Sequence, residues 1–505
     1  MAQPSGAVAA GHPVTAAAAE EILREGGNAF DAVIAAAAAA CVAEPVLASL
    51  AGGGFLLAHK EGAAPVVHDF FAQTPRQRRP ENETEFYPVH ADFGYATQEF
   101  HIGMGSVATP GVIAGLFDIH RHHGSLPMTR LLEPAIRGAR QGVRIEQLQS
   151  YIFDVVTPIY RASEGAIEAY GSLYPGRIHR QPALAATLEA LSREGPDLFY
   201  SGELGHRLGE LSREQGGHLC AADLESYRVI HRDPLSIDYR GARIFTNPPP
   251  TAGGILIGFG LGLLEATGMD PAFPASPGHL CLMAEVLEAT VAARIAVLAE
   301  AASSGELSSE LLATYRERVA GAPPMSRGTT HISIIDKVGS AAALTLSNGE
   351  GCGHLIPDKG IMLNNMLGEE DINPDGFNAW PQNRRMTSMM APTLVERDGC
   401  RIAMGSGGSN RIRSAILQVI VNLLDYRDDP ASAVARPRLH AEAGHLSIEG
   451  GFPTEVIDAL VEAHPAAELW PERNLFFGGV HLAMREAGGF AAAGDPRRGG
   501  IGLTL

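Results

Sequence analysis

Hydrophobic residues recur along the start of the chain at helical spacing. One such segment begins at Pro13 and ends at Gly26 and Gly27, and a second runs from Asn28 to Pro45. Proline fits the first turn of a helix, asparagine is a favourable N-cap, and paired glycines end a helix. The second segment carries alanine on most faces, which predicts a helix packed closely against its neighbours on all sides.

Strand-like alternation follows these two segments. A glycine-rich turn leads into one strand, and residues 64–75 have the pattern of its hairpin partner. Between 107 and 230 the apolar spacing returns to three and four, with glycines near the segment ends, which predicts several amphipathic helices. A strand region at 237–250 comes next, and two further helices are expected at 253–268 and 279–302.

From Thr329 onward the chain consists mainly of short segments in which apolar and polar residues alternate. Residues 330–336 and 340–348 flank a Lys-Val-Gly turn, which is typical of a hairpin, and further strands precede a helix that begins near Asn410. Strands and helices in both halves of the chain predict an α/β or α+β layered fold. The Gly-Phe-Gly-Leu-Gly run at 258–262 lies inside an apolar helical segment, so it indicates packing rather than phosphate binding.

Composition narrows the classes of protein that fit this pattern. Hydrophobic residues make up 45% of the 505 residues and charged residues 19%, as in ordinary soluble proteins. A net charge of -18 argues against nucleic acid or anionic membranes as partners. The longest apolar run, at 32–43, is too short to span a bilayer, and no signal peptide precedes it, so we expect a cytoplasmic protein.

Metal ligands and cysteines give no clear site in the sequence. The five cysteines are scattered and lack zinc-site spacing, which argues against a disulfide framework or a structural zinc site. A histidine-rich run at 120–124 would place His120 and His123 on one face of a helix. We expect no carboxylate or further histidine to complete a site there, so a solvated helix end is the favoured interpretation, and no metal is expected.

Thr329 is the strongest candidate for a nucleophile. A hydroxyl needs a base within hydrogen-bond reach, and the α-amino group of an N-terminal threonine can be that base, with a pKa of roughly 7.7 to 8. That amine exists only if the chain is cut before Thr329. A small residue such as Gly328 would let the hydroxyl attack the preceding peptide bond and make the cut itself. The alternative is a threonine that merely begins a strand.

Two loops in the second half offer further candidates. An acidic run at 368–371 follows a pair of asparagines, and it is either a solvated turn or a site for a cationic substrate amine. A glycine-rich run at 405–411 leads into a helix, so its backbone N–H groups could hold an oxyanion. Neither loop identifies a reaction when it is taken alone.

Taken together, these segments resemble the gamma-glutamyltransferase (gamma-glutamyl transpeptidase) family, in the expected order and over nearly the whole chain. The resemblance is carried by residues 21–45, 51–57, 109–116, 195–205, 238–254, 329–336, 360–365, 387–395, 405–412 and 494–500. That family is similar in fold to other N-terminal-nucleophile hydrolases. The resemblance therefore implies a four-layer αββα sandwich.

The resemblance also implies self-cleavage of one precursor between Gly328 and Thr329. Residues 1–328 and 329–505 would form a large and a small subunit, interwoven as a single domain over 1–505. This heterodimer could pair further into a dimer of heterodimers. The implied reaction is acyl transfer from a small-molecule amide through a threonyl acyl-enzyme to water or an amine, without a metal or organic cofactor.

Catalytic roles carry over from the family to matching positions. Thr329 would be the nucleophile, Thr330 and Ser347 would supply hydroxyls that tune it, and the N–H groups around Gly407 and Gly408 would form the oxyanion hole. These assignments rest on the resemblance alone. They would make Thr329 both the catalytic residue and the first residue of the small subunit.

The residues that would hold the substrate depart from the family pattern. Phe71 stands where the family usually carries an arginine that grips the substrate α-carboxylate, and a phenyl ring cannot replace a bidentate guanidinium. The family asparagine falls on Gly349, or on Asn348 if the register shifts by one, and Met366 replaces a polar residue. The other candidate substrate-binding residues are Asn365, Glu369, Glu370, Asp371, Thr387 and Ser388, with Arg384, Arg385 or Arg411 as substitutes for the missing arginine.

Three hypotheses follow from this combination. The first is a self-processing hydrolase or acyltransferase that acts on a γ-glutamyl or related amide, with altered carboxylate recognition. The second keeps the N-terminal threonine but acts on a non-glutamyl substrate, either another acyl amide or a step in a specialised biosynthetic pathway. The third is an uncleaved, inactive relative that serves as a binding protein.

Overall fold

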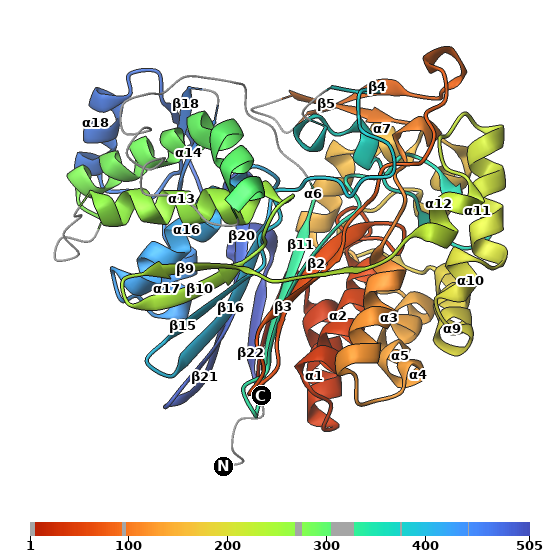
Figure 1. Ribbon diagram of the computed structural model, residues 1–505, viewed down its shortest axis with the longest axis horizontal. Helices are drawn as coiled ribbons and strands as arrows, with labels where there is room; N and C mark the ends of the chain where they lie inside the picture. The colour runs from red at the N-terminus through yellow and green to blue at the C-terminus, as the bar shows by residue number, and fades with distance from the viewer. Residues whose placement is uncertain (1–5, 93–96, 268–274, 305–327, 374–375, 443) are drawn as a thin grey trace.

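Two antiparallel sheets pack against each other at the centre of the molecule, and helices cover the outer side of each (Figure 1). The computed structural model describes residues 6–92, 97–267, 275–304, 328–373, 376–442 and 444–505. The four layers, helix, sheet, sheet and helix, confirm the fold that the resemblance implied. Within the described residues, no helix combines the length and the apolar character needed to cross a membrane.

The first sheet has seven strands and contains β11, the strand that follows Thr329. Its order is β22 (Ile501–Thr504), β1 (Gly6–Ala10), β11 (Thr330–Asp336), β12 (Ala341–Ser347), β2 (Gly53–His59), β3 (Val66–Phe70) and β8 (Ile230–Arg232). The hairpins predicted for β2 with β3 and for β11 with β12 are confirmed, and every neighbouring pair is antiparallel.

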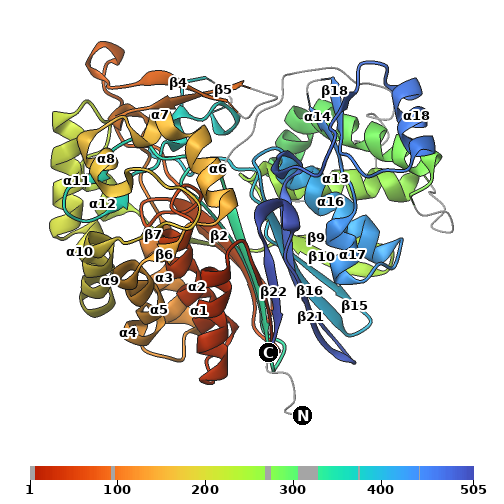
Figure 2. The same cartoon turned by 180° about the vertical axis from the view of Figure 1, so that it is seen from behind.

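Strands from the two halves of the chain alternate in this sheet. β1 lies between β22 and β11, and β12 pairs with β2. Figure 2, seen from behind, shows β22 and the end of the chain beside the strands of the N-terminal half. Residues 7–10 and 501–504 are therefore neighbours in space.

The second sheet has six strands. Its order is β21 (Gly489–Ala493), β20 (Gly479–Glu486), β16 (Cys400–Gly407), β15 (Thr393–Arg397), β10 (Ala242–Thr246) and β9 (Leu235–Tyr239). The strand region expected at 237–250 is the hairpin of β9 and β10. Its turn uses Arg240 and Gly241, both with positive φ.

Helices pack on the outer side of the first sheet. They include α1 (Pro13–Arg24), α2 (Ala29–Ala43), α3 (Val112–His123), α5 (Glu133–Gln141) and α9 (Pro182–Glu194). Asn28 caps α2 as expected, because its side chain accepts the N–H groups of Phe30 and Asp31 while Asp31 accepts the N–H of Asn28. Every residue of α2 is buried, which confirms the packing that its alanines predict.

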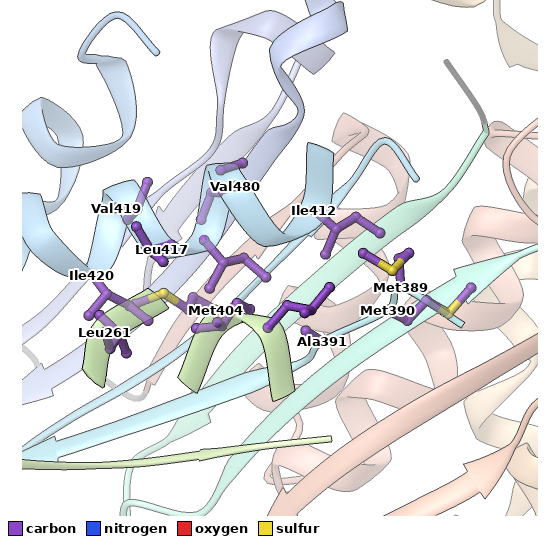
Figure 3. Close-up of a cluster of buried hydrophobic side chains, with 14 of the residues drawn as sticks. Leu261, Met389, Met390, Ala391, Met404, Ile412, Leu417, Val419, Ile420 and Val480 are labelled. Atoms are coloured by element: carbon purple, nitrogen blue, oxygen red, sulfur yellow. The ribbon is translucent and has the colours of Figure 1, made fainter. Parts of the chain in front are cut away.

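The second sheet is covered by α13 (Ala252–Ala266), α14 (Pro277–Ser304) and α16 (Arg411–Leu424). Figure 3 shows the core between them, where Leu417 and Ile420 of α16 lie beside Leu261 of α13 and Met404 of β16. A methyl group added at Gly260 would lie 2.3 Å from the side chain of Leu417. Gly260, at the centre of the 258–262 run, thus allows close helix packing.

The remaining elements surround these layers. The other helices are α4 (Met128–Leu131), α6 (Gln147–Val155), α7 (Thr157–Tyr160), α8 (Glu164–Tyr170), α10 (Asp197–Tyr200), α11 (Glu203–Glu214), α12 (Ala221–Ser226), α17 (Pro430–Ala435) and α18 (Thr454–Ala463). The other strands are β4 (Tyr87–Asp92), β5 (Thr97–Ile102), β6 (Val143–Arg144), β7 (Ile178–His179), β13 (Leu355–Ile356), β14 (Ile361–Met362), β17 (Leu439–Glu442), β18 (His445–Ile448) and β19 (Glu468–Leu469).

Candidate active site

Two hydroxyl groups converge on the peptide bond that precedes β11. The Thr329 hydroxyl donates to the carbonyl oxygen of Gly328 at 2.8 Å, and the Ser347 hydroxyl donates to the same oxygen at 2.8 Å. The N–H of Gly349 donates to the Ser347 oxygen at 3.0 Å, which orients that hydroxyl. Ser347 can therefore polarise the carbonyl group while the Thr329 oxygen lies beside it.

Glycines allow the backbone to come this close. A methyl group added at Gly328 would lie 2.8 Å from the carbonyl oxygen of Gly349, and one added at Gly407 would lie 2.1 Å from that of Thr329. The N–H of Gly328 donates to the buried carboxylate of Glu350 at 2.7 Å. The peptide between Gly328 and Thr329 is thus held on both sides by contacts that a larger residue would displace.

Thr330 makes a different contact from Thr329. Its hydroxyl donates to one carboxylate oxygen of Glu44 at 2.7 Å, and Thr15 donates to the other oxygen at the same distance. Burial raises the pKa of Glu44, although these hydrogen bonds and the charge of Arg498 act against the rise. The Thr330 side chain therefore binds the C-cap residue of α2 and not the carbonyl oxygen of Gly328 that Thr329 contacts.

Arg498 was not assigned a role from the sequence, yet it contacts Thr329. Its guanidinium donates to the carbonyl oxygen of Thr329 at 3.4 Å. Burial lowers the pKa of Arg498 to about 10, which leaves it charged at neutral pH. The sequence signal was the Gly-Asp-Pro-Arg-Arg-Gly-Gly segment at 494–500, which carried the resemblance but not a function.

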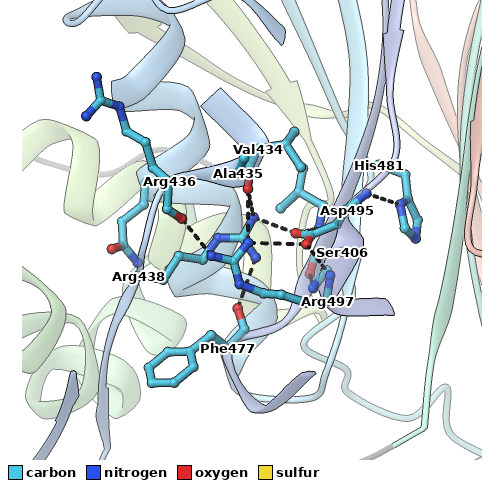
Figure 4. A network of polar contacts seen from close by, with 12 residues as sticks. Ser406, Val434, Ala435, Arg436, Arg438, Phe477, His481, Asp495 and Arg497 are labelled. Carbon is cyan, nitrogen blue, oxygen red and sulfur yellow. Dashed lines mark hydrogen bonds and ion pairs between the residues drawn. The ribbon is translucent and has the colours of Figure 1, made fainter. Parts of the chain in front are cut away.

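A buried ionic network holds the segment that carries Arg498 (Figure 4). One oxygen of Asp495 accepts from Arg438 at 2.6 Å and from the N–H of Val480 at 2.9 Å, and the other accepts from the N–H of Arg497 at 2.9 Å. The N–H of Asp495 donates to His481 at 3.1 Å. Because these groups are paired and buried, the position of Arg498 is fixed before any substrate binds.

A small cavity of about 30 Å³ adjoins the two hydroxyls. It is lined by Phe71, Gly328, Thr329, Ser347, Met366, Glu369, Asp371, Ile372, Ser388, Met389, Met390, Ser409 and Ile412. Its apolar wall continues the core of Figure 3, where Met389, Met390 and Ile412 are labelled. The fold thus brings Phe71, Glu369, Asp371 and Ser388 to the nucleophile.

The ionisable side chains that line this cavity are acidic. Glu369 and Asp371 line it, and Ser409 donates a hydrogen bond to Asp371. No basic side chain lines it among the residues that the structure describes. Phe71 is 1% exposed and stacks on Phe55, so the position of the family arginine is filled by an aromatic pair.

The three arginines considered as substitutes lie elsewhere. Arg385 contacts the carbonyl oxygen of Phe71 and the Tyr227 hydroxyl, with Asp69 at 3.5 Å. The guanidinium of Arg411 lies 4.9 Å over the ring of Phe476. Arg384 is exposed and donates its backbone N–H to Thr74. None of the three lines the cavity, so none supplies the missing cation there.

Other predicted substrate residues stand behind or outside the cavity. Asn365 accepts the N–H of Glu350 at 2.9 Å, and so supports the loop after β12. The Thr387 hydroxyl donates to the carbonyl oxygen of Pro250 at 2.7 Å. Glu370 is exposed to solvent. Gly408 has a φ of +118° at the turn before α16, where a methyl group would lie 3.1 Å from Arg498.

Gly349 and Asn348 differ in what they can offer a ligand. Gly349 has a φ of +64°, and a methyl group there would lie 2.0 Å from Asn365 and 2.2 Å from Glu369. No side chain can occupy that position. Asn348 is fully buried, and neither of its amide atoms has a hydrogen-bond partner among the described residues. It is therefore the only one of the two positions with a side chain that can bind a ligand.

Comparison with known proteins decides the family. The model of the gamma-glutamyltranspeptidase family matches residues 15–505. The chain belongs to the gamma-glutamyltranspeptidase family. The glutathione hydrolase proenzyme of Escherichia coli (strain K12) is 29% identical over 489 residues, covering 87% of this chain and 82% of that protein. The acylase ACY 1 proenzyme of Pseudomonas sp. (strain SE83) is 30% identical over 481 residues, covering 90% and 86%.

Solved structures agree on the fold. The cephalosporin acylase from Bacillus halodurans superimposes with a TM-score of 0.84 at 23% identity, covering 99% of this chain and 96% of that one. Such a likeness establishes the N-terminal-nucleophile hydrolase fold for this gamma-glutamyltranspeptidase-family enzyme. The named relatives include both glutathione hydrolases and acylases, so family membership alone leaves the acyl group open.

Proposed function

We propose that this enzyme is a self-processing amide hydrolase or acyltransferase in which Thr329 is the nucleophile. The observation that carries the proposal is the pair of hydroxyls, from Thr329 and Ser347, on the single carbonyl oxygen of Gly328. One of these groups can attack while the other stabilises the charge that develops on that oxygen. The tight fit of Gly328 against Gly349 supports the same cut.

The cleavage step transfers an acyl group within the chain. The Thr329 oxygen attacks the carbonyl carbon of Gly328, and the hydroxyl proton passes to the nitrogen as the C–N bond breaks. The product is an ester between Gly328 and the Thr329 side chain, with a free α-amine on Thr329. Water then hydrolyses this ester, which leaves a carboxylate on Gly328 and restores the threonine hydroxyl.

Turnover repeats this chemistry on an external amide. The free α-amine of Thr329, with an ordinary pKa of roughly 7.7 to 8, takes the proton of its own hydroxyl. The hydroxyl oxygen attacks the substrate carbonyl, the amine portion of the substrate leaves with that proton, and the acyl-enzyme is then hydrolysed or transferred to an acceptor amine. Ser347 and the backbone near Gly407 are the candidates for holding the oxyanion.

The cavity favours an acyl group without an α-carboxylate. It offers an apolar wall and the acids Glu369 and Asp371, and no cation lines it among the described residues. A carboxylate placed there would lie beside Glu369 and Asp371, whose side chains carry the same sign of charge, whereas an ammonium group would be attracted to them. The relatives named as glutathione hydrolase and acylase support an amide substrate in either case.

Self-cleavage is tested by denaturing gel electrophoresis of the purified chain. We expect two fragments, of residues 1–328 and 329–505, with N-terminal sequencing of the smaller one giving Thr329. The Thr329→Ala variant should run as one intact chain, because it lacks the attacking oxygen. A wild-type chain that stays intact after prolonged incubation would contradict the proposal and favour an uncleaved binding protein.

Substrate preference is tested with three anilides that share one leaving group. These carry a γ-glutamyl group, a glutaryl group that lacks the amine, and a 4-aminobutanoyl group that lacks the carboxylate. The acidic cavity predicts a kcat/KM for the 4-aminobutanoyl anilide at least about tenfold above that for the glutaryl anilide, roughly the effect of one charge contact. A strong and exclusive γ-glutamyl preference would contradict this account of Phe71.

A further inference from the structure

A cluster of histidines surrounds Asp118 on the outer side of the first sheet. Asp118, His122 and His123 lie on α3, His68 lies on β3 and His231 lies on β8. His68 and His231 are directly opposed partners in the pairing of β3 with β8. The sequence suggested a solvated helix end with no carboxylate or further histidine nearby. That expectation is wrong, because the fold brings His68 and His231 to the end of α3 that carries the histidine run.

The atoms that face one another are metal ligands at short separations. One carboxylate oxygen of Asp118 lies 2.8 Å from Nδ1 of His68 and 2.7 Å from Nε2 of His231. Ligand atoms of these three residues all lie within 4.8 Å of one another. Tetrahedral zinc with bonds of about 2.1 Å spaces its ligands about 3.4 Å apart, so each imidazole nitrogen needs to move only about 0.6 to 0.7 Å away from the carboxylate oxygen.

We propose that His68, Asp118 and His231 bind one Zn²⁺ ion that joins α3 to the β3–β8 edge of the first sheet. Two imidazoles and one carboxylate are a donor set that zinc accepts in proteins. The His231 side chain is 39% exposed, so the fourth position faces solvent and takes water.

A neighbouring histidine can orient the ring of His68 as a metal ligand. Nε2 of His123 lies 3.0 Å from Nε2 of His68 and can accept the proton of a ring that binds metal through Nδ1.

Its place in the sheet gives this ion a structural role. β8 is the outermost strand and has only three residues, so few ladder hydrogen bonds hold it. His68 shares a face of β3 with Phe70, which packs against the outer helices, whereas Val67 packs between the sheets. The ion would thus fasten the sheet edge to α3, and neither the scissile peptide nor the cavity supplies a ligand to it.

Zinc titration of the untagged full-length chain tests the site. After treatment with EDTA and dialysis, isothermal titration and elemental analysis should give one Zn²⁺ per chain, and Tm should rise when zinc is added. His231→Ala and Asp118→Asn should weaken zinc binding at least about tenfold, with far-UV circular dichroism unchanged. The matched control is His445→Ala, which removes an exposed histidine from β18 and should bind zinc like the wild type.

The outcomes separate this site from the catalytic one. Loss of zinc uptake in His231→Ala, together with unchanged cleavage at Thr329, supports the proposal. Two results would overturn it: a wild-type chain that takes up no stoichiometric zinc, or a His231→Ala chain that takes up as much as His445→Ala. Neither result depends on whether the chain cleaves itself, so a failure here leaves the proposed function untouched.

Discussion

At the scale of single residues, Ser347 is the contact on which the proposed reaction depends besides Thr329. It donates to the carbonyl oxygen that must carry negative charge in the cleavage step. Its own orientation is set by the N–H of Gly349. A hydroxyl held in this way stabilises the transition state without having to reorganise first.

Removing this hydroxyl should slow self-cleavage. We expect the Ser347→Ala chain to cleave about 10²- to 10³-fold more slowly than the wild type, the usual effect of losing one oxyanion donor. The rate is read from a denaturing gel time course that starts with freshly translated precursor. Ser347→Thr keeps the hydroxyl and should cleave at a rate near that of the wild type. Equal rates for all three chains would exclude the role given to Ser347.

The sequence pointed to Thr329, because nucleophile and scissile bond are adjacent in the chain. It did not point to the roles of Glu350 or Arg498. Glu350 reaches Gly328 across a loop, and Arg498 reaches Thr329 from the far end of the chain. Their positions depend on tertiary packing and on the ionic network around Asp495. Neither can be predicted from the pattern of neighbouring residues in the sequence.

At the scale of elements, the sequence predicted correctly those helix ends and hairpins that are set by residues close together in the chain. The helix α2 begins where its cap predicts, because Asn28 and Asp31 satisfy each other's backbone N–H groups. The hairpins of the first sheet follow from turn residues and alternation. One of the strands expected before Asn410 covers only Ile361–Met362, and the side chains of Asn364 and Asn365 just after it bind backbone groups of other segments.

The cap of α2 provides a stability test. Asn28→Ala should lower the free energy of unfolding by about 1 kcal/mol, because it leaves the N–H groups of Phe30 and Asp31 without an acceptor. Thermal unfolding followed by circular dichroism measures the shift. Asn28→Ser keeps an acceptor oxygen and, like Asn28→Ala, loses the amide that donates to the carbonyl oxygen of His123, so it should stay closer to the wild type. A larger loss for Asn28→Ser than for Asn28→Ala would contradict this assignment.

At the scale of the whole molecule, the two halves of the chain are woven into the same sheets. Each proposed fragment supplies strands to both sheets, and β1 of the first half lies between β22 and β11 of the second. Separating the halves would expose ladder hydrogen bonds and the core between the sheets. Sequence patterns predict the layers but not this interleaving, because strand order depends on contacts far apart in the chain.

The interleaving predicts that cleavage leaves the particle intact. Size-exclusion chromatography in native buffer should give the same elution volume for the cleaved wild type and the uncleaved Thr329→Ala chain. Two bands should separate only under denaturing conditions. Dissociation of the two fragments in native buffer would contradict the expected heterodimer.

Buried histidines predict that acid destabilises the fold. Burial lowers the pKa of several of them from 6.5 to about 4: His12, His179, His218, His440 and His481. The unfolded chain therefore binds protons below pH 6.5 that the folded chain excludes until about pH 4, so stability falls as the pH drops through this window. A pKa lowered from 6.5 to about 4 corresponds to a loss of about 3 kcal/mol of folding free energy for each histidine, once the pH is below about 4.

Thermal unfolding in EDTA-containing buffers of matched ionic strength checks this expectation. Tm should fall by several degrees between pH 7 and pH 5. His481→Gln should reduce that fall, because it removes one of the groups that the unfolded chain protonates. A Tm that is equal or higher at pH 5 would show that these histidines do not control acid stability.

The central position of β11 has a consequence for the end that cleavage creates. A new chain terminus usually frays, but β11 is hydrogen-bonded on one side to β1 and on the other to β12. The amine of Thr329 would therefore begin a strand whose backbone cannot swing away from the sheet. Amide hydrogen exchange in residues 330–336 should be as slow after the cut as before it, which makes the catalytic terminus one of the most rigid points of the protein.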